Sequence, residues 1–305
     1  MKGPINRQEI EAFGRMDLIA NQIVQGFITG LHKSPFHGFS VEFAEHRLYN
    51  PGEDTRHIDW RLYGRSEKLF IKQYEEETNL RCRFLIDTSS SMFYPERTDK
   101  NFNKIEFSAY AVAAFTEMLK RQRDAFGVSY FGSEVYYHSE VKSTQAHQSF
   151  LFKQLEQLLG ETGKPESNII QALHQIAEQV HKRSLVFIFS DMFDQAVNQE
   201  ALFDALQHLR HNRHEVIIFH TVDKRTELDF DFGNRPVTFI DVETNRELKA
   251  NPQQLKQAYT TRIKKYVDDL KIRCGDYRID YVEADVSEGF NKILMSYLLK
   301  RQRMM

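Results

Sequence analysis

The sequence predicts an α/β protein built on a doubly wound, mostly parallel sheet, preceded by a small N-terminal α+β segment. From residue 81 onward, short apolar runs rich in β-branched and aromatic residues alternate with long amphipathic stretches. This alternation is typical of parallel strands connected by helices. Two of the runs, Phe84–Ile86 and Leu185–Phe189, are apolar at every position, as expected of central strands that are covered on both faces.

The first 78 residues have a different pattern. Apolar residues recur at helical spacing from Ile5 to Leu31, which predicts a helix with one buried face. Two short β-like runs follow, Phe39–Phe43 and Leu69–Tyr74, with a turn signal between them. We therefore expect an α+β segment over residues 1–78 and a larger α/β domain over residues 79–305.

In the larger domain, we expect a strand where apolar residues form a short run and a helix where they recur every three or four residues. The expected strands are Cys82–Ile86, Ala125–Phe131, Glu134–His138, Ser184–Phe189, Val216–Thr221, Val237–Val242 and Tyr277–Val282. The expected helices are Lys104–Arg123, Gln145–Leu159, Ile169–Lys182, Asn198–Arg210, Pro252–Lys271 and Gly289–Arg301.

Composition excludes several classes of protein. The 305 residues include 41 basic and 43 acidic side chains, a balance that argues against binding nucleic acid through bulk positive charge. The mean hydropathy is −0.54, and no apolar run approaches the roughly 20 residues that span a bilayer. We therefore expect a cytoplasmic protein with no membrane span. The two cysteines, Cys82 and Cys274, are expected to be buried thiols.

Polar residues follow the two fully apolar strands. Asp87, Ser89 and Ser91 alternate directly after the first strand, and Asp191 comes just after the second. Alternate side chains of an extended loop point the same way, and the carboxyl ends of parallel strands meet at one edge of the sheet. Ser167, shortly before a predicted helix, adds a further hydroxyl. These side chains are therefore expected to converge.

Two carboxylates and three hydroxyls form a donor set of hard oxygens, which suits Mg²⁺ or Mn²⁺ better than zinc. A simpler interpretation stays open at this point. Serine and aspartate are common helix caps and turn residues, so Asp87 or Ser167 would then cap the helix that follows.

This pattern resembles the metal-ion-dependent adhesion site of the von Willebrand factor A fold. The resemblance implies one divalent cation, held by an Asp and two Ser of the first loop and by a hydroxyl of a second loop, with a later Asp acting through water. The sixth position would accept an acidic side chain of a protein partner. Thr162 is an alternative to Ser167 as the hydroxyl of the second loop. The matching residues are Asp87, Ser89, Ser91, Ser167 and Asp191.

A second resemblance lies upstream, from Arg47 to Glu77, and the two resemblances together cover the chain from about Arg47 to Asp191. The stretch Asn50–Trp60, with the sequence NPGEDTRHIDW, resembles the motif of the bacterial domain of unknown function fifty-eight. Members of this family carry an A-like domain after the motif. The resemblance also implies a MoxR-type AAA+ ATPase as a partner.

The role of the upstream motif has two interpretations. In the first, Arg56 pairs with Asp59 and Trp60 anchors the loop, so that the motif fixes the small segment to the larger domain. In the second, Arg47, Arg56 and Arg65 form part of a surface that binds a partner, because arginine and tryptophan often dominate interfaces.

Taken together, these features predict a non-enzymatic, metal-dependent protein-interaction module that acts in protein assembly or regulation. One alternative is a metal-assisted hydrolase or phosphotransferase with Asp87 as the nucleophile. Phosphatases of that architecture usually carry a second carboxylate two residues later, where this chain has Ser89. The other alternative is a scaffold whose metal site is vestigial.

Overall fold

The structure is a computed structural model, in which the chain divides into two compact units. One unit comprises Met1–Phe27 and Leu80–Met305, and the other comprises Ile28–Asn79. The structure describes residues 14–32, 46–48, 63–64, 70–72, 80–98, 101–163, 168–181, 183–192, 199–241 and 246–304.

A six-stranded sheet forms the centre of the larger unit. Its strands are β3 (Arg81–Asp87), β4 (Ala125–Phe131), β5 (Val135–His138), β6 (Leu185–Ser190), β7 (Glu215–Val222) and β10 (Asp280–Asp285). The spatial order is β10-β7-β6-β3-β4-β5. All neighbours pair in parallel except β5, which runs antiparallel to β4 at one edge. This is the doubly wound order, which reverses direction between β3 and β6. The predicted doubly wound, mostly parallel sheet is confirmed.

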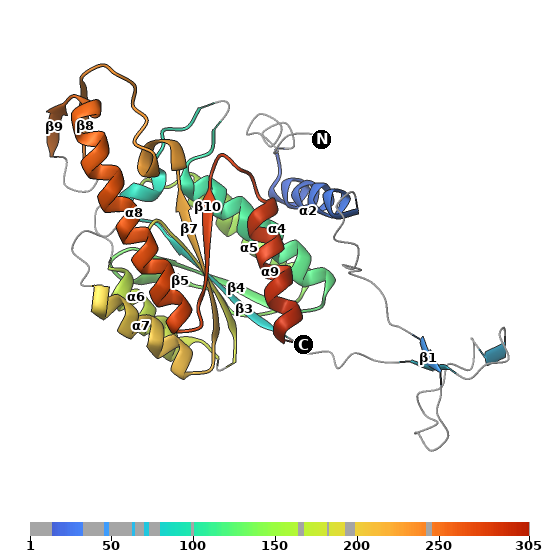
Figure 1. Ribbon diagram of the computed structural model, residues 1–305. Coiled ribbons are helices and arrows are strands. Elements are labelled where there is room, and N and C mark those ends of the chain that lie inside the picture. The colour runs from blue at the N-terminus through green and yellow to red at the C-terminus, as the bar shows by residue number, and fades with distance from the viewer. Residues whose placement is uncertain are drawn as a thin grey trace. The chain divides into compact units, whose positions relative to one another are not determined.

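Helices cover both faces of this sheet (Figure 1). Rings of α4 and α9 pack on one face, whereas α6, α7 and α8 contribute to the core on the other. Within the described ranges, every helix is too short or too polar to cross a bilayer. The helices of the larger unit are α4 (Lys104–Arg121), α5 (Gln145–Leu159), α6 (Ile169–Gln179), α7 (Gln199–His211), α8 (Pro252–Asp276) and α9 (Asn291–Met304).

One face of the sheet is aromatic. The central strands place Phe84, Phe187 and Phe219 side by side, with ring centroids 4.8 Å apart for the first pair and 6.1 Å for the second. Phe115 of α4 lies on these rings, 5.1 Å from Phe187, and Tyr297 of α9 meets Phe115 edge-on at 5.7 Å. Stacked and edge-on rings add to the free energy of burial, so this layer fixes α4 and α9 on the sheet.

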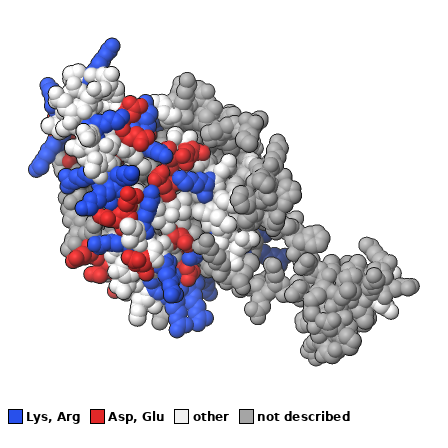
Figure 2. All heavy atoms as spheres, viewed as in Figure 1, with Lys and Arg blue, Asp and Glu red and all other residues white. Residues whose placement is uncertain are grey.

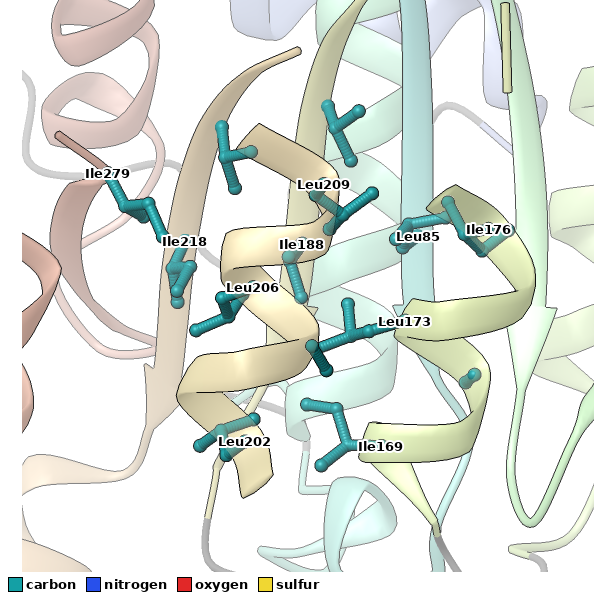
Figure 3. Close-up of a cluster of buried hydrophobic side chains, with 14 of the residues drawn as sticks. Leu85, Ile169, Leu173, Ile176, Ile188, Leu202, Leu206, Leu209, Ile218 and Ile279 are labelled. Carbon is teal, nitrogen blue, oxygen red and sulfur yellow. The ribbon is translucent and has the colours of Figure 1, made fainter. Parts of the chain in front are cut away.

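The opposite face is aliphatic (Figure 3). Alternate residues of the same strands, Leu85, Ile188 and Ile218, point into a cluster with Leu173 of α6 and Leu206 of α7. The residues in this cluster are almost completely buried. Because side chains alternate across a strand, the sequence itself assigns phenylalanine to one face and branched residues to the other.

The predicted strand Val237–Val242 does not join the central sheet. It forms β8 (Val237–Ile240), which pairs antiparallel with β9 (Glu247–Ala250), a strand that the sequence pattern did not reveal. Its side chains alternate between half-buried and exposed, which suits a hairpin packed on one side and not a central strand. Phe239 packs against Phe230, with centroids 5.5 Å apart.

The smaller unit contains a second antiparallel pair, between β1 (His46–Leu48) and β2 (Phe70–Lys72). β2 falls inside the predicted run Leu69–Tyr74. The other predicted run, Phe39–Phe43, lies outside the described residues.

The N-terminal helix, α2 (Met16–His32), falls within the predicted range Ile5–Leu31 apart from its last residue. Residues before 14 lie outside the described part of the chain. The backbone N–H of Met16 donates to Glu156 Oε1 of α5 at 3.1 Å, and α2 belongs to the larger unit as far as Phe27. The division into residues 1–78 and 79–305 stays a prediction.

Two helices end earlier than predicted, whereas α7, α8 and α9 end later, at His211, Asp276 and Met304. α4 ends at Arg121 and not at Arg123, and α6 ends at Gln179 and not at Lys182. The turns after four helices contain an arginine with left-handed backbone where glycine is usual, so the sequence carries no glycine to mark these ends. The arginines are Arg123, Arg183, Arg213 and Arg278, with φ between 56° and 61°.

Charged side chains of both signs are interspersed on the larger unit in the view of Figure 2. The formal net charge of −2 is therefore spread over many residues of each sign. A few charged side chains are buried, and some of these form the candidate site described below.

We expect Phe115→Ala to lower the free energy of unfolding by about 3–5 kcal/mol, because it removes the ring of α4 that packs on the phenylalanines of the central strands. Phe150→Ala is the matched control, since Phe150 is 47% exposed. Urea denaturation of both variants measures the difference. Equal losses in the two variants would show that the aromatic layer is not the main packing contact of α4.

Candidate functional site

Asp87 ends β3 at the carboxyl edge of the sheet, and the parallel register of β3 with β6, in which Ile86 lies opposite Phe189, brings it beside Ser190. Asp87 Oδ2 accepts a hydrogen bond from Ser190 Oγ at 2.7 Å, and Oδ1 accepts one from the backbone N–H of Ser89 at 2.9 Å. Asp87 is buried. The carboxylate is therefore held from two neighbouring strand ends.

The loop after Asp87 gathers the predicted hydroxyls. Ser89 Oγ and Ser91 Oγ lie 3.0 Å apart. Both the backbone N–H and the hydroxyl of Thr88 donate to the carbonyl of Phe131, which fixes the start of the loop against β4. The structure thus brings Asp87, Ser89 and Ser91 together at the edge where the sequence predicts them.

The second loop is described only in part. Ser167 lies outside the described residues. Thr162, its rival, is exposed. Next to it, Gly163 packs on the first loop so closely that a Cβ at this position would lie 2.5 Å from Ser90 Cα. Only glycine allows this approach, so the backbone beside Thr162 touches the loop that carries the hydroxyls.

Asp191 follows β6 and binds a buried ammonium group. Its Oδ2 accepts from Lys104 Nζ at 2.8 Å, and the same ammonium donates to Glu227 Oε1 at 2.5 Å. Lys104 is the first residue of α4 and is completely buried. Glu227 belongs to a π-helical turn after β7, η3 (Lys224–Leu228). One lysine therefore joins the loops that follow two neighbouring strands.

Sequence reasoning missed Lys104 and Glu227. One signal was available for the lysine. The N-terminus of a helix carries partial positive charge, so a cation in the first turn is unfavourable unless something compensates it. Lys104 directly follows the N-cap residue Asn103, and two carboxylates provide that compensation.

The buried charges shift one another's pKa values. Burial, together with the charge of Asp191, raises the pKa of Asp87 to about 7, although hydrogen bonds from Ser89 and Ser190 oppose the shift. Burial alone would lower the pKa of Lys104, but the two carboxylates that bind it hold its pKa above the usual value. Asp191 thus has a cationic partner, whereas no cation pairs with Asp87 among the described residues.

The backbone after Asp191 is held in a specific shape. His220 Nε2 lies 2.7 Å from the Asp191 carbonyl, and burial lowers the pKa of His220 to about 4, so the neutral ring donates this hydrogen bond and its Nδ1 accepts from Tyr281. Met192 has φ 56°, a left-handed conformation that is costly for a bulky residue. Its N–H donates to Ser190 Oγ at 3.0 Å, which supports the turn.

The residues of the upstream motif are mostly outside the described part of the chain. Arg47 lies in β1, opposite Ile71 of β2. Arg56, Asp59 and Trp60 are not among the described residues, so both interpretations of the motif stay predictions.

The donor set at this edge of the sheet fits a hard divalent cation. Asp87, Ser89 and Ser91 supply a carboxylate and two hydroxyls, all of them oxygen donors. No group of three or more His, Cys, Asp or Glu among the described residues could hold a metal ion, so a cation here would depend on the serine hydroxyls. A buried carboxylate without a partner charge is costly, and a cation next to Asp87 would remove that cost.

Comparison with known families identifies the chain. The family described as "Protein of unknown function DUF58" matches residues 45–267. The chain therefore belongs to this family, and the resemblance to it is confirmed. The uncharacterized proteins Rv1480 of Mycobacterium tuberculosis and Mb1516 of Mycobacterium bovis are each 22% identical to it over 255 residues, covering 83% of this chain and 77% of each relative.

The solved structures that match this chain are remote in sequence. The conserved hypothetical protein BatB from Bacteroides thetaiotaomicron is 11% identical, with a TM-score of 0.45 over 73% of this chain and 99% of that chain. The VWA domain of SpRpn10 is 16% identical, with a TM-score of 0.31 over 46% of this chain and 74% of that domain.

We expect Asp87→Asn to raise the free energy of unfolding in EDTA by roughly 1–3 kcal/mol at about pH 8, because it removes a charge that burial disfavours and that also repels Asp191. Asp276→Asn, which removes an exposed carboxylate of α8, should change it little. Thermal and urea denaturation measure both variants. A clear loss of stability in Asp87→Asn would contradict the electrostatic account.

Proposed function

We propose that the chain is a metal-dependent protein-interaction module. The observation that carries the proposal is Asp87, a buried carboxylate that has no cationic partner among the described residues and lies beside two serine hydroxyls. Asp87, Ser89 and Ser91 would hold one Mg²⁺ or Mn²⁺, with Ser167 adding a hydroxyl from the second loop and Asp191 acting through water.

The neutral hydroxyls determine what such a site would bind. A bound Mg²⁺ or Mn²⁺ would supply a Lewis-acidic position at the edge of the sheet. Of the residues that would touch it, only Asp87 carries formal charge, and the charge of Asp191 is already shared with Lys104. An acidic side chain of a partner protein would therefore find incompletely neutralised positive charge.

The proposal also includes a partner and a location in the cell. We propose a MoxR-type AAA+ ATPase as a partner, a role in protein assembly or regulation, and a cytoplasmic location. The support is family membership, which the match over residues 45–267 establishes. Affinity capture of the wild type and of Asp87→Ala, each with and without EDTA, tests the partner and its metal dependence together.

A second candidate is a scaffold that does not need a metal. The observation in its favour is Lys104, which already supplies Asp191 with a cation from within the chain. In that case, partner binding and thermal stability would be the same in EDTA and in Mg²⁺.

Metal binding should depend on Asp87. We expect Asp87→Ala to weaken Mn²⁺ binding by at least about 100-fold, because it removes the only charged direct ligand. Asp276→Ala, which removes an exposed carboxylate, should bind Mn²⁺ like the wild type. Isothermal titration of the three proteins measures this, and equal affinities in all three would refute the metal site.

The second-loop ligand can be assigned by two conservative changes. Ser167→Ala should weaken Mn²⁺ binding about tenfold through the loss of one neutral oxygen ligand, whereas Thr162→Ala should leave it unchanged. The reverse result would assign the ligand to Thr162. The same titration serves as the measurement.

A further inference from the structure

We infer that Lys104 and Glu227 set the strength with which this site binds a divalent cation, although neither is a ligand. The inference rests on the proposed function, since it concerns the same site. Its basis is a single ammonium group shared between Asp191 Oδ2 at 2.8 Å and Glu227 Oε1 at 2.5 Å.

The lysine is fixed in place. Its side chain is completely buried, and its backbone N–H donates to the carbonyl of Tyr94 at 3.1 Å. The ammonium lies 5.9 Å from the centroid of the Tyr94 ring. Tyr94 in turn donates its hydroxyl hydrogen to Thr226 at 2.8 Å, next to Glu227. The positive charge is therefore held between the carboxylates and is not free to move into solvent.

Glu227 is fixed as firmly as its partner. Its second oxygen accepts from the backbone N–H of Asp223 at 2.8 Å, and its carbonyl accepts from Tyr259 Oη of α8 at 2.9 Å. The Glu227 carboxylate therefore stays beside Lys104. It partly neutralises the ammonium group and so weakens the attraction between Lys104 and Asp191.

The charges of this cluster then define two opposite effects. Asp87, Asp191 and Glu227 carry three negative charges, and Lys104 carries one positive charge, so the buried cluster has a formal charge of −2. Removing the ammonium makes it −3 and should strengthen cation binding. Removing the Glu227 charge makes it −1, leaves the whole ammonium to Asp191, and should weaken cation binding.

The fold offers a matched control. Lys300 Nζ is also shared between two carboxylates, Glu215 Oε2 at 2.6 Å and Asp280 Oδ2 at 2.8 Å. These carboxylates begin β7 and β10, at the edge of the sheet opposite to Asp87. Lys300→Met therefore removes a similar bridge without changing the charge at the site.

The experiment compares Mn²⁺ binding by the full chain, followed by electron paramagnetic resonance of free Mn²⁺. We expect Lys104→Met to bind Mn²⁺ on the order of tenfold more tightly than the wild type, and Glu227→Gln on the order of tenfold more weakly. The Mn²⁺ affinity of the double variant should return to within about threefold of that of the wild type. Lys300→Met should bind Mn²⁺ with the same affinity as the wild type. Because Lys104→Met removes the cation from two buried carboxylates, the double variant and Glu227→Gln keep the test valid if that variant unfolds.

The outcomes separate this inference from the proposed function. Unchanged affinity in Lys104→Met and Glu227→Gln, or a shift of both in the same direction, would overturn the inference while the metal site stands. Binding by Lys104→Met alone would support the inference and overturn metal binding by the natural protein. Absence of binding in all five proteins would overturn both.

Discussion

The parallel pairing of β3 with β6 is the constraint on which the site depends. These strands are 103 residues apart at Asp87 and Ser190, yet they are neighbours at the point where the strand order reverses. In doubly wound sheets the connections leave in opposite directions at this point and open a crevice. The strand ends therefore deliver Asp87 and Asp191 to one place, and the chain must then deal with two buried carboxylates that repel each other.

The division of the sheet into an aromatic and an aliphatic face determines how one of these two carboxylates, Asp191, receives a counter-ion. Phe84, Phe187 and Phe219 seat Phe115, and with it the whole of α4, over the central strands. The first residue of that helix is Lys104. A packing pattern that looks purely structural thus places an ammonium group between Asp191 and Glu227, at the cost of a cation at the positive end of a helix.

Most of the fold could be predicted because its signals are local. Short apolar runs located β3, β4 and β6 within one or two residues, whereas the predicted strand Tyr277–Val282 begins three residues before β10. Helix ends were less accurate, since left-handed arginines such as Arg123 replace the glycine that usually marks them. The β8 strand was assigned to the wrong sheet, because a run of four residues carries no information about which strand it pairs with. In the site, the structure groups Asp87, Ser89 and Ser91 as predicted, although Ser91 lies in a 3-10 turn (η2, Ser90–Phe93) and not in an extended loop. Lys104 lies 87 and 123 residues from its two partners, so its position in the first helical turn is a local signal but the identity of its partners is not.

The position of Lys104 also bears on the order in which the molecule is assembled. Asp191 receives its counter-ion from the same polypeptide, so part of the negative charge that the sheet edge buries is balanced as soon as α4 docks. Folding of the sheet then does not have to wait for an ion from solution. A metal would bind a scaffold that has already folded as the last step of maturation. Because binding would remove the cost of burying the Asp87 charge, a higher concentration of free divalent cation would also stabilise the folded protein.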